Sequence, residues 1–198
     1  MDEKYNINGA YQPTVKRYAD YNGVDFYPTP KWATYALMNN EKFNGSVFEC
    51  ACGDGQMAEV IKNYNNVQSS DLYDYGYGKA HINFLEVKDR YQNIITNPPF
   101  NEAENFVLHA YDIVEEKMAF LLRLAFLEST KRQEKIFNII PPTRVWVFSE
   151  RITFYPRGKQ RQGSGTTAYA WFIWDKAKKK QPTEIHWLPV GYKKKYGD

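Results

Sequence analysis

The sequence predicts an α/β fold in which helices cover both faces of a doubly wound, mostly parallel sheet. Two observations predict it. Short apolar segments alternate with segments of helical periodicity through most of the 198 residues. The last two apolar segments, 144–148 and 167–174, are rich in Val, Trp, Tyr and Phe and are joined by a long connection without helical periodicity. This pattern is typical of an antiparallel pair at one edge of the sheet.

Each element follows from a local signal. Pro28 and Pro30 precede the first helix, since proline is favoured where a helix begins. Apolar positions then recur every 3.6 residues in helices and every second residue in strands. The expected helices are 31–40, 56–64, 102–114 and 127–137. The expected strands are 46–50, 66–70, a short one near 81–84, 91–96, 118–122 and the final pair.

Composition excludes several classes of protein. The length corresponds to about one domain, so we expect a single catalytic domain over 1–198. No apolar run approaches the ~20 residues of a membrane helix, and the first residues lack the basic start and apolar stretch of a secretory signal, which predicts a cytoplasmic protein. The only cysteines, Cys50 and Cys52, are expected to be reduced, because a disulfide between residues two apart would be strained. No metal site is expected.

Positive charge is concentrated near the C-terminus. From Arg151 onward the sequence holds 11 Lys or Arg and 3 Asp or Glu, a balance of +8, whereas the first 150 residues carry −5. A one-sided basic segment favours a polyanionic partner. The alternative is that these lysines are merely solvated.

A glycine turn and two acids predict a nucleotide-like ligand. Gly53 and Gly55 follow a predicted strand and open a helix, so the backbone can pass close to a ligand. Ala58 stands where a dinucleotide motif prefers its third glycine, a spacing that does not exclude NAD. Glu49, before the turn, would repel a pyrophosphate but suits a cationic ligand. Asp71 ends the next strand, where a carboxylate typically accepts hydrogen bonds from the ribose hydroxyls of a nucleotide. S-adenosylmethionine has these features; the alternative is a tight turn with solvated acids.

The tetrapeptide Asn97-Pro98-Pro99-Phe100 follows the strand 91–96. The two prolines fix φ and remove two backbone donors, which holds the carbonyls in a rigid turn. The Asn97 side-chain oxygen and the Pro98 carbonyl could then accept hydrogen bonds from one exocyclic amino group and aim its lone pair at an electrophilic methyl group. Phe100 would stack on the ring that carries the amine. The alternative is an ordinary turn.

In this order and spacing, the glycine turn with Glu49, then Asp71 and then the tetrapeptide resemble motifs I, II and IV of class I S-adenosylmethionine-dependent amino-methyltransferases, especially adenine-N6 DNA methyltransferases. Residues 25–30 resemble their motif X, and the linear order resembles the gamma arrangement. The likeness covers about 25–175 and is greatest to small methyltransferase-like proteins of phages and prophages. It implies a Rossmann-like class I methyltransferase fold and a bacterial or phage-infected host cell.

The resemblance also implies roles for individual residues. Tyr27, Thr29 and Pro30 would line the methionine part of the cofactor, Glu49 and Gly53 its amino-acid and sulfonium region, and Asp71 its ribose. Asn83 replaces the Asp that the family often has beside the cofactor adenine, which removes a charge there. The full set implied for cofactor binding is Tyr27, Thr29, Pro30, Glu49, Cys50, Gly53, Gly55, Asp71, Leu72, Asn83 and Phe84. The set implied for catalysis is Asn97, Pro98, Pro99 and Phe100.

The sequence departs from the family in having no separate target-recognition domain, because only about 25 residues follow Trp174. Specificity is then low, or a partner or second subunit of a homodimer supplies it, or the substrate presents its amine without a duplex. The connection after Glu150 holds no acid before Asp175. Its cations could neutralise phosphates, so it is the candidate nucleic-acid contact, with a solvated loop as the alternative. These cations are Arg151, Arg157, Lys159 and Arg161.

Four functions remain compatible with the sequence. We expect an N6-adenine DNA methyltransferase that uses S-adenosylmethionine. The same chemistry on adenine in RNA is the first alternative, since the tetrapeptide selects an amine rather than a sugar. Glutamine methylation in proteins and a non-catalytic, nucleic-acid-binding subunit with a methyltransferase fold are the others. The intact tetrapeptide argues against the non-catalytic subunit, whereas Asn83 and the missing recognition domain argue for it.

Overall fold

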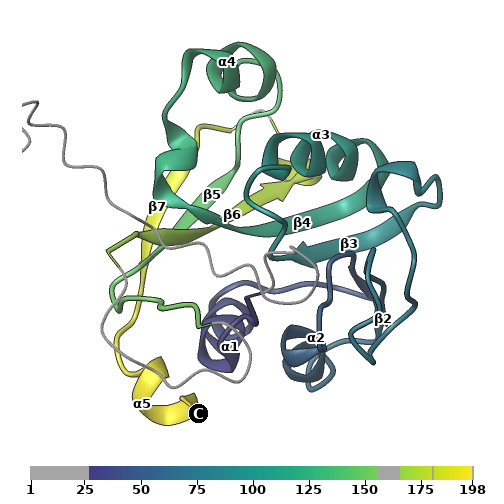
Figure 1. The fold of residues 1–198 in the computed structure, drawn as a ribbon. Helices are drawn as coiled ribbons and strands as arrows, with labels where there is room; N and C mark the ends of the chain where they lie inside the picture. Colours follow the sequence, from purple (N-terminus) through teal and green to yellow (C-terminus); the bar gives the residue numbers. More distant parts are fainter. Residues whose placement is uncertain (1–26, 156–165, 180, 198) are drawn as a thin grey trace, which may run out of the picture.

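The computed structural model of the chain describes residues 27–155, 166–179 and 181–197, which form a mixed sheet with helices on both faces (Figure 1). Its strand order is β2-β1-β3-β4-β6-β5-β7. The strands are β1 (Val47–Glu49), β2 (Val67–Ser69), β3 (Tyr91–Thr96), β4 (Val114–Arg123), β5 (Arg144–Phe148), β6 (Tyr169–Asp175) and β7 (Glu184–Leu188). The helices are α1 (Lys31–Asn40), α2 (Gln56–Ile61), α3 (Ala103–Ile113), α4 (Thr130–Arg132), which continues as a π-helix (Gln133–Phe137), and α5 (Tyr192–Tyr196).

The sheet confirms the predicted fold class. Strand β1 pairs in parallel with β2 and β3, and β3 pairs in parallel with β4. Strand β6 runs antiparallel to both β4 and β5. The antiparallel pair β5–β6 is therefore present, but the prediction that it forms the edge is wrong, because β7 adds in parallel outside β5.

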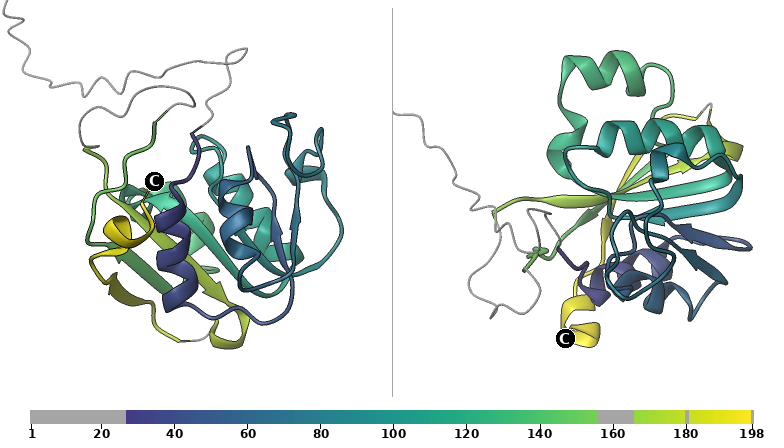
Figure 2. Two further views of the ribbon diagram at one scale, coloured as in Figure 1. Left: turned by 90° about the horizontal axis from the view of Figure 1, so that it is seen from below. Right: turned by 45° about the vertical axis from the view of Figure 1, so that its right-hand side comes forward.

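Successive residues of the central strands point to opposite faces of the sheet and pack in two separate hydrophobic cores, one on each face. In β4, Met118, Phe120 and Leu122 join the core under α3, while Ala119 and Leu121 join the core under α1 and α2. Period-two alternation of this kind is what a strand buried on both faces requires. The right-hand view of Figure 2 shows α3 and α4 on one side of the sheet and the other helices on the opposite side.

Two expected elements differ from the structure. The predicted strand near 81–84 is wrong, because His81 has a φ of 61° and Asn83 accepts a hydrogen bond from the Leu85 N–H, which starts a short 3-10 helix (Phe84–Glu86) instead. The predicted helix 127–137 is broken into a 3-10 helix (Leu124–Leu127), α4 and the π-helix, since Ser129 adopts a φ of 127°.

The C-terminal elements β7 and α5 were not expected from the sequence. Helix α5 packs beside α1, as the left-hand view of Figure 2 shows. The Tyr196 ring stacks on that of Tyr35 with centroids 4.1 Å apart, and the Asn40 amide donates to the Tyr192 hydroxyl at 2.9 Å. No helix in the described parts of the chain is long and apolar enough to cross a membrane.

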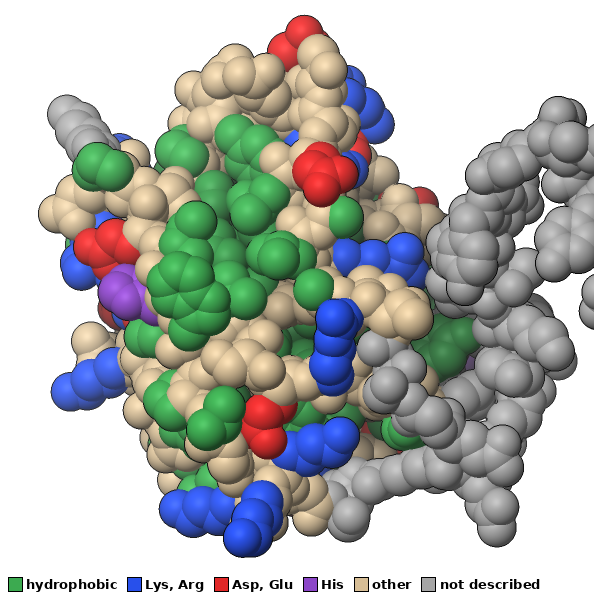
Figure 3. All heavy atoms as spheres, turned by 90° about the vertical axis from the view of Figure 1, so that its left-hand side faces the viewer, with side chains coloured by type: hydrophobic (Ala, Val, Ile, Leu, Met, Phe, Trp, Pro, Cys, Tyr) green, Lys and Arg blue, Asp and Glu red, His purple; other side chains and the backbone are tan. Residues whose placement is uncertain are grey.

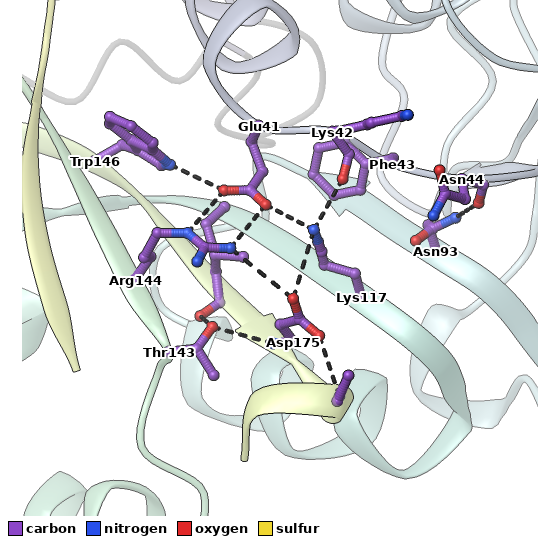
Figure 4. Close-up of polar contacts among 12 residues, drawn as sticks. Glu41, Lys42, Phe43, Asn44, Asn93, Lys117, Thr143, Arg144, Trp146 and Asp175 are labelled. Atoms are coloured by element: carbon purple, nitrogen blue, oxygen red, sulfur yellow. Dashed lines mark hydrogen bonds and ion pairs between the residues drawn. The ribbon is translucent and has the colours of Figure 1, made fainter. Parts of the chain in front are cut away.

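A buried carboxylate joins four elements at the amino ends of the parallel strands (Figure 4). Glu41 follows α1, is 5% exposed, and accepts hydrogen bonds from Lys117 Nζ (2.7 Å), from Arg144 Nε and Nη2 (both 2.9 Å) and from Trp146 Nε1 (3.1 Å). Asp175, at the end of β6, lies 3.6 Å from Lys117. These bonds tie α1 to β4, β5 and β6 at the end of the sheet opposite the tetrapeptide.

Candidate functional site

The carboxyl ends of β1, β2 and β3 meet at one edge of the sheet, where ligands of open α/β sheets bind. A small hollow of about 30 Å³, partly open to solvent, lies there. It is lined by Pro28, Thr29, Glu49, Ala51, Cys52, Gly53, Asp54, Gln56, Met57 and Asn97. The structure therefore brings together four of the predicted site residues, Thr29, Glu49, Gly53 and Asn97, from three separate segments.

The turn between β1 and α2 has the backbone conformation that its glycines permit. Gly53 has a φ of 52° and Gly55 a φ of 85°, values that side chains with a Cβ rarely adopt. A Cβ on Gly55 would also lie 2.4 Å from the Tyr77 ring, so this position has a second reason to be glycine. The Gly53 N–H donates to Asp71 Oδ2 at 2.8 Å, which fixes the turn against the end of β2.

Two acids lie beneath this turn with raised pKa values. Glu49 is 1% exposed; burial first, and then the charge of Asp71, raise its pKa well above the ordinary value, against a hydrogen bond from the Ala58 N–H. Burial also raises the pKa of Asp71, although the N–H groups of Tyr73 and Gly53 donate to it. Glu49 Oε2 is buried and has no hydrogen-bond partner among the described residues. A cationic ligand at this point would stabilise the ionised carboxylate.

The tetrapeptide presents an unpaired acceptor to the hollow. Asn97 Nδ2 donates to Thr29 Oγ1 at 3.0 Å, which turns the amide so that Oδ1 is buried without a partner among the described residues. The Pro99 carbonyl accepts from the Glu102 N–H at 2.9 Å. Buried acceptors are normally paired, so the Asn97 oxygen is available to a donor from outside the described residues.

Phe100, the last residue of the tetrapeptide, packs against other aromatic rings. Its ring centroid is 6.1 Å from that of Phe154 and 5.7 Å from that of Tyr169. The guanidinium of Arg123, at the end of β4, lies 4.7 Å from the same centroid. Arg123 was not singled out from the sequence, where it is simply the charge that ends an apolar strand.

Comparison with known proteins supports the fold. No protein-family model matches the sequence, and no curated protein matches it. A Listeria monocytogenes protein described as a class I S-adenosylmethionine-dependent methyltransferase aligns in structure with a TM-score of 0.53 at 14% identity, over 79% of this chain and 62% of that chain. The chain has the class I methyltransferase fold.

Two further structures with this methyltransferase fold are similar. A Vibrio vulnificus protein described as the modification subunit of a type I restriction enzyme aligns with a TM-score of 0.57 and 14% identity, over 84% of this chain. The chain spans 48% of that subunit, about half its length. A Pyrococcus horikoshii protein described as an RNA methyltransferase has a TM-score of 0.54 and 15% identity, over 75% of this chain and 85% of that one.

Several residues expected to bind the cofactor lie outside the hollow of this methyltransferase fold. Both polar atoms of Asn83 are used in its own turn, since Oδ1 accepts from the Leu85 N–H at 3.2 Å and Nδ2 donates to Glu86 Oε1 at 2.7 Å. Phe84 is 2% exposed, and its side chain packs in the core under α3. The remaining expected residues that do not line the hollow are Tyr27, Pro30, Cys50, Gly55, Asp71 and Leu72.

Other residues line the hollow although the sequence did not single them out. They belong to the same turn, to the start of α2 or to the segment before α1. Cys52 is one; burial raises its pKa to about 12, so it is a neutral thiol. Of the predicted nucleic-acid contacts, Arg151 is exposed and donates to the Thr166 carbonyl at 2.7 Å. Arg157, Lys159 and Arg161 lie outside the described residues.

Proposed function

We propose that the chain is an S-adenosylmethionine-dependent methyltransferase that methylates an exocyclic amino group, most specifically N6 of adenine in DNA. The observation that carries this proposal is the buried Asn97 Oδ1, which has no hydrogen-bond partner among the described residues and lies beside a hollow that also holds the similarly unpartnered Oε2 of Glu49. One site thus offers an acceptor for an amine and a carboxyl group whose ionised form a cation would favour. The fold that this chain shares with a protein described as the modification subunit of a type I restriction enzyme is consistent with the proposal.

The chemistry of the hollow fits the proposed cofactor, which supplies an electrophilic methyl group on a sulfonium when bound. The Glu49 carboxylate would balance the positive charge, and the turn at Gly53 lets the backbone approach closely. Asp71 has lone pairs left to accept ribose hydroxyls beyond the bonds it accepts from backbone N–H groups.

The tetrapeptide would orient the acceptor. Asn97 Oδ1 and the Pro98 carbonyl each accept one hydrogen bond from the amino group, which draws its protons to one side and directs its lone pair at the methyl carbon. Thr29 holds the amide in the required orientation through the bond at 3.0 Å. The cofactor, held at Glu49 and Gly53, would supply the methyl group, and no described residue of the hollow is assigned the role of a base, because a methylated ammonium would be acidic enough to lose its proton to water.

Methyl transfer from labelled cofactor tests the proposal directly. The protein is incubated with duplex DNA, single-stranded DNA, RNA and protein, and each product is digested to nucleosides or amino acids. We expect label in N6-methyladenine from DNA. Label in adenine of RNA or in glutamine of protein would show that the substrate is RNA or protein instead of DNA, while the methylation of an amino group would still hold. Cofactor binding without transfer to any substrate would favour the non-catalytic, nucleic-acid-binding subunit.

Asp71→Ala should weaken cofactor binding by about ten- to a hundredfold, because it removes charge-assisted hydrogen bonds to the ribose worth roughly 1.5–3 kcal/mol. Titration calorimetry measures this. Asp74→Ala is a matched control, since Asp74 is an exposed carboxylate in the same loop that accepts from the Gly76 N–H. Equal affinity of wild type and Asp71→Ala would contradict the assignment of the ribose site.

The basic connection should bind phosphates of the nucleic acid. Replacing Arg157, Lys159 and Arg161 together with Ala is expected to lower the slope of log K against log salt by roughly 0.7–0.9 for each phosphate that is no longer neutralised, with unchanged cofactor affinity. The triple replacement of Lys193, Lys194 and Lys195 with Ala serves as the control for net charge. An unaltered slope on both duplex and single-stranded DNA would mean that the loop is solvated and that phosphates bind elsewhere.

A further inference from the structure

The outer edge of β7 is an apolar strand edge in the described part of the chain. Ile185 is 52% exposed and Trp187 is 66% exposed, and both lie on the sheet face that carries Val145 and Val147, their partners in β5. Figure 3 views the molecule from the side of β7, and hydrophobic side chains gather at the centre of that face. Edge strands are normally protected by lysine or by covering elements, and β7 contains no lysine.

The backbone of β7 has hydrogen-bonding groups directed at this open edge. The Glu184 N–H donates inward to the Thr143 carbonyl at 3.0 Å. Because successive residues of a strand point their N–H and C=O groups to opposite sides, Glu184, His186 and Leu188 face β5, while Ile185 and Trp187 face outward. Pro182 and Pro189 flank the strand and cannot donate, so pairing at this edge is confined to the residues between them.

These five residues are complementary to a second copy of themselves. If two β7 strands run antiparallel about a twofold axis at His186, Ile185 of each chain lies opposite Trp187 of the other. These two positions then form hydrogen-bonded pairs with four backbone bonds, and His186 forms the central non-hydrogen-bonded pair. Each Ile–Trp pair sets a β-branched side chain against an aromatic one, a favourable cross-strand combination. If the register were shifted by one residue, the outward N–H and C=O groups of each strand would lie opposite residues whose own groups face β5, and no hydrogen bonds could form between the two strands.

We propose that the chain forms a homodimer by antiparallel pairing of β7 with β7 of a second copy, centred on His186. The sheets of the two protomers join into one continuous sheet, and the apolar surface of Ile185 and Trp187 is covered by the same surface of the partner. The axis reverses the strand direction, so the two candidate sites face opposite ends of the joined sheet.

Sedimentation velocity on the full chain over a range of concentrations tests the dimer. We expect wild type to dimerise, and Ile185→Lys and Trp187→Lys each to weaken association at least about tenfold by placing a charge in the pairing edge. Val190→Lys is the matched control, because Val190 is 73% exposed but lies beyond the strand and Pro189. A wild type that stays monomeric, or lysine variants that associate like wild type, would overturn the proposal.

A disulfide experiment locates the axis and does not depend on the lysine variants. In His186→Cys the two new thiols face each other across a non-hydrogen-bonded pair, whose Cα atoms are typically about 4.5 Å apart and within disulfide range. Mild oxidation should crosslink this variant into a covalent dimer. Glu184→Cys should not crosslink, since its copies would lie at opposite ends of the paired strands, and the native Cys50 and Cys52 are buried. Crosslinking at 184 but not at 186 would exclude this register.

Discussion

Asn97→Ala should lower the rate of methyl transfer by about 10²–10³, because it removes a preorganised acceptor from a buried site. The variant loses Oδ1, which has no partner among the described residues, and also the amide that donates to Thr29 at 3.0 Å. Cofactor affinity should change little, since the amide is assigned to the acceptor amine. Single-turnover rates and calorimetry on the same preparations separate the two effects.

Two comparisons make this result specific. Asn101→Ala, at an exposed position directly after the tetrapeptide, should retain wild-type turnover. Thr29→Val should fall between the two, because it leaves the Asn97 amide in place but removes the oxygen that orients it. If Asn97→Ala keeps more than about a tenth of the wild-type rate, the tetrapeptide is a structural turn and the proposed acceptor site is wrong.

Glu41→Ala should destabilise the fold by about 3–5 kcal/mol, since it removes the carboxylate closest to two buried cations and leaves them only the longer contacts to Asp175 and Glu184. Arg144 and Lys117 both bond to Glu41, and their side chains are only 11% and 16% exposed. Chemical denaturation monitored by circular dichroism measures the free energy of unfolding. Glu59→Ala is the control, because its ion pair with Lys62 is solvent-exposed and should leave stability unchanged.

The effect of Glu41 should depend on pH. Burial raises the pKa of Glu41, but hydrogen bonds from Arg144, Lys117 and Trp146 outweigh it, so the folded-state pKa lies below the ordinary value of 4.5. The ionised carboxylate therefore stabilises the folded state above pH 4.5, and this contribution is lost as the pH falls through the folded-state pKa. The difference in unfolding free energy between wild type and Glu41→Ala should shrink in acid; a constant difference would show that packing, not charge, causes it.

The sequence predicts those elements whose local signals agree with their packing. Helix α1 and strands β3 and β5 have the predicted bounds, because proline marks the start of α1 and each strand contains consecutive β-branched or aromatic residues that favour an extended backbone. Strand β7 was missed since its five residues are mostly exposed and follow a run of lysines. The strand near His81 was predicted wrongly, because a single residue with positive φ interrupts an otherwise extended pattern.

In the candidate site, too, features set by the local backbone could be predicted from the sequence, whereas features set by packing could not. The glycine turn and the proline pair are visible in the sequence since backbone conformation restricts which residues can occupy them. In contrast, the sequence does not show which groups a given side chain contacts in the folded protein. Asn83 has the amide expected for a ligand contact, yet both of its polar atoms serve its own turn. Thr29 was expected to touch the cofactor, but its contact with Asn97 depends on packing between segments 68 residues apart.

The buried carboxyl group of Glu49 has a consequence for the proposed reaction. Burial raises the pKa of Glu49 and so disfavours its ionised form, whereas a ligand with positive charge would favour that form. Affinity for a cationic ligand should therefore increase with pH. The proposed methyl donor would carry a positive charge on its sulfonium, and its demethylated product would not. Glu49 would therefore favour binding of the charged donor over binding of the neutral product.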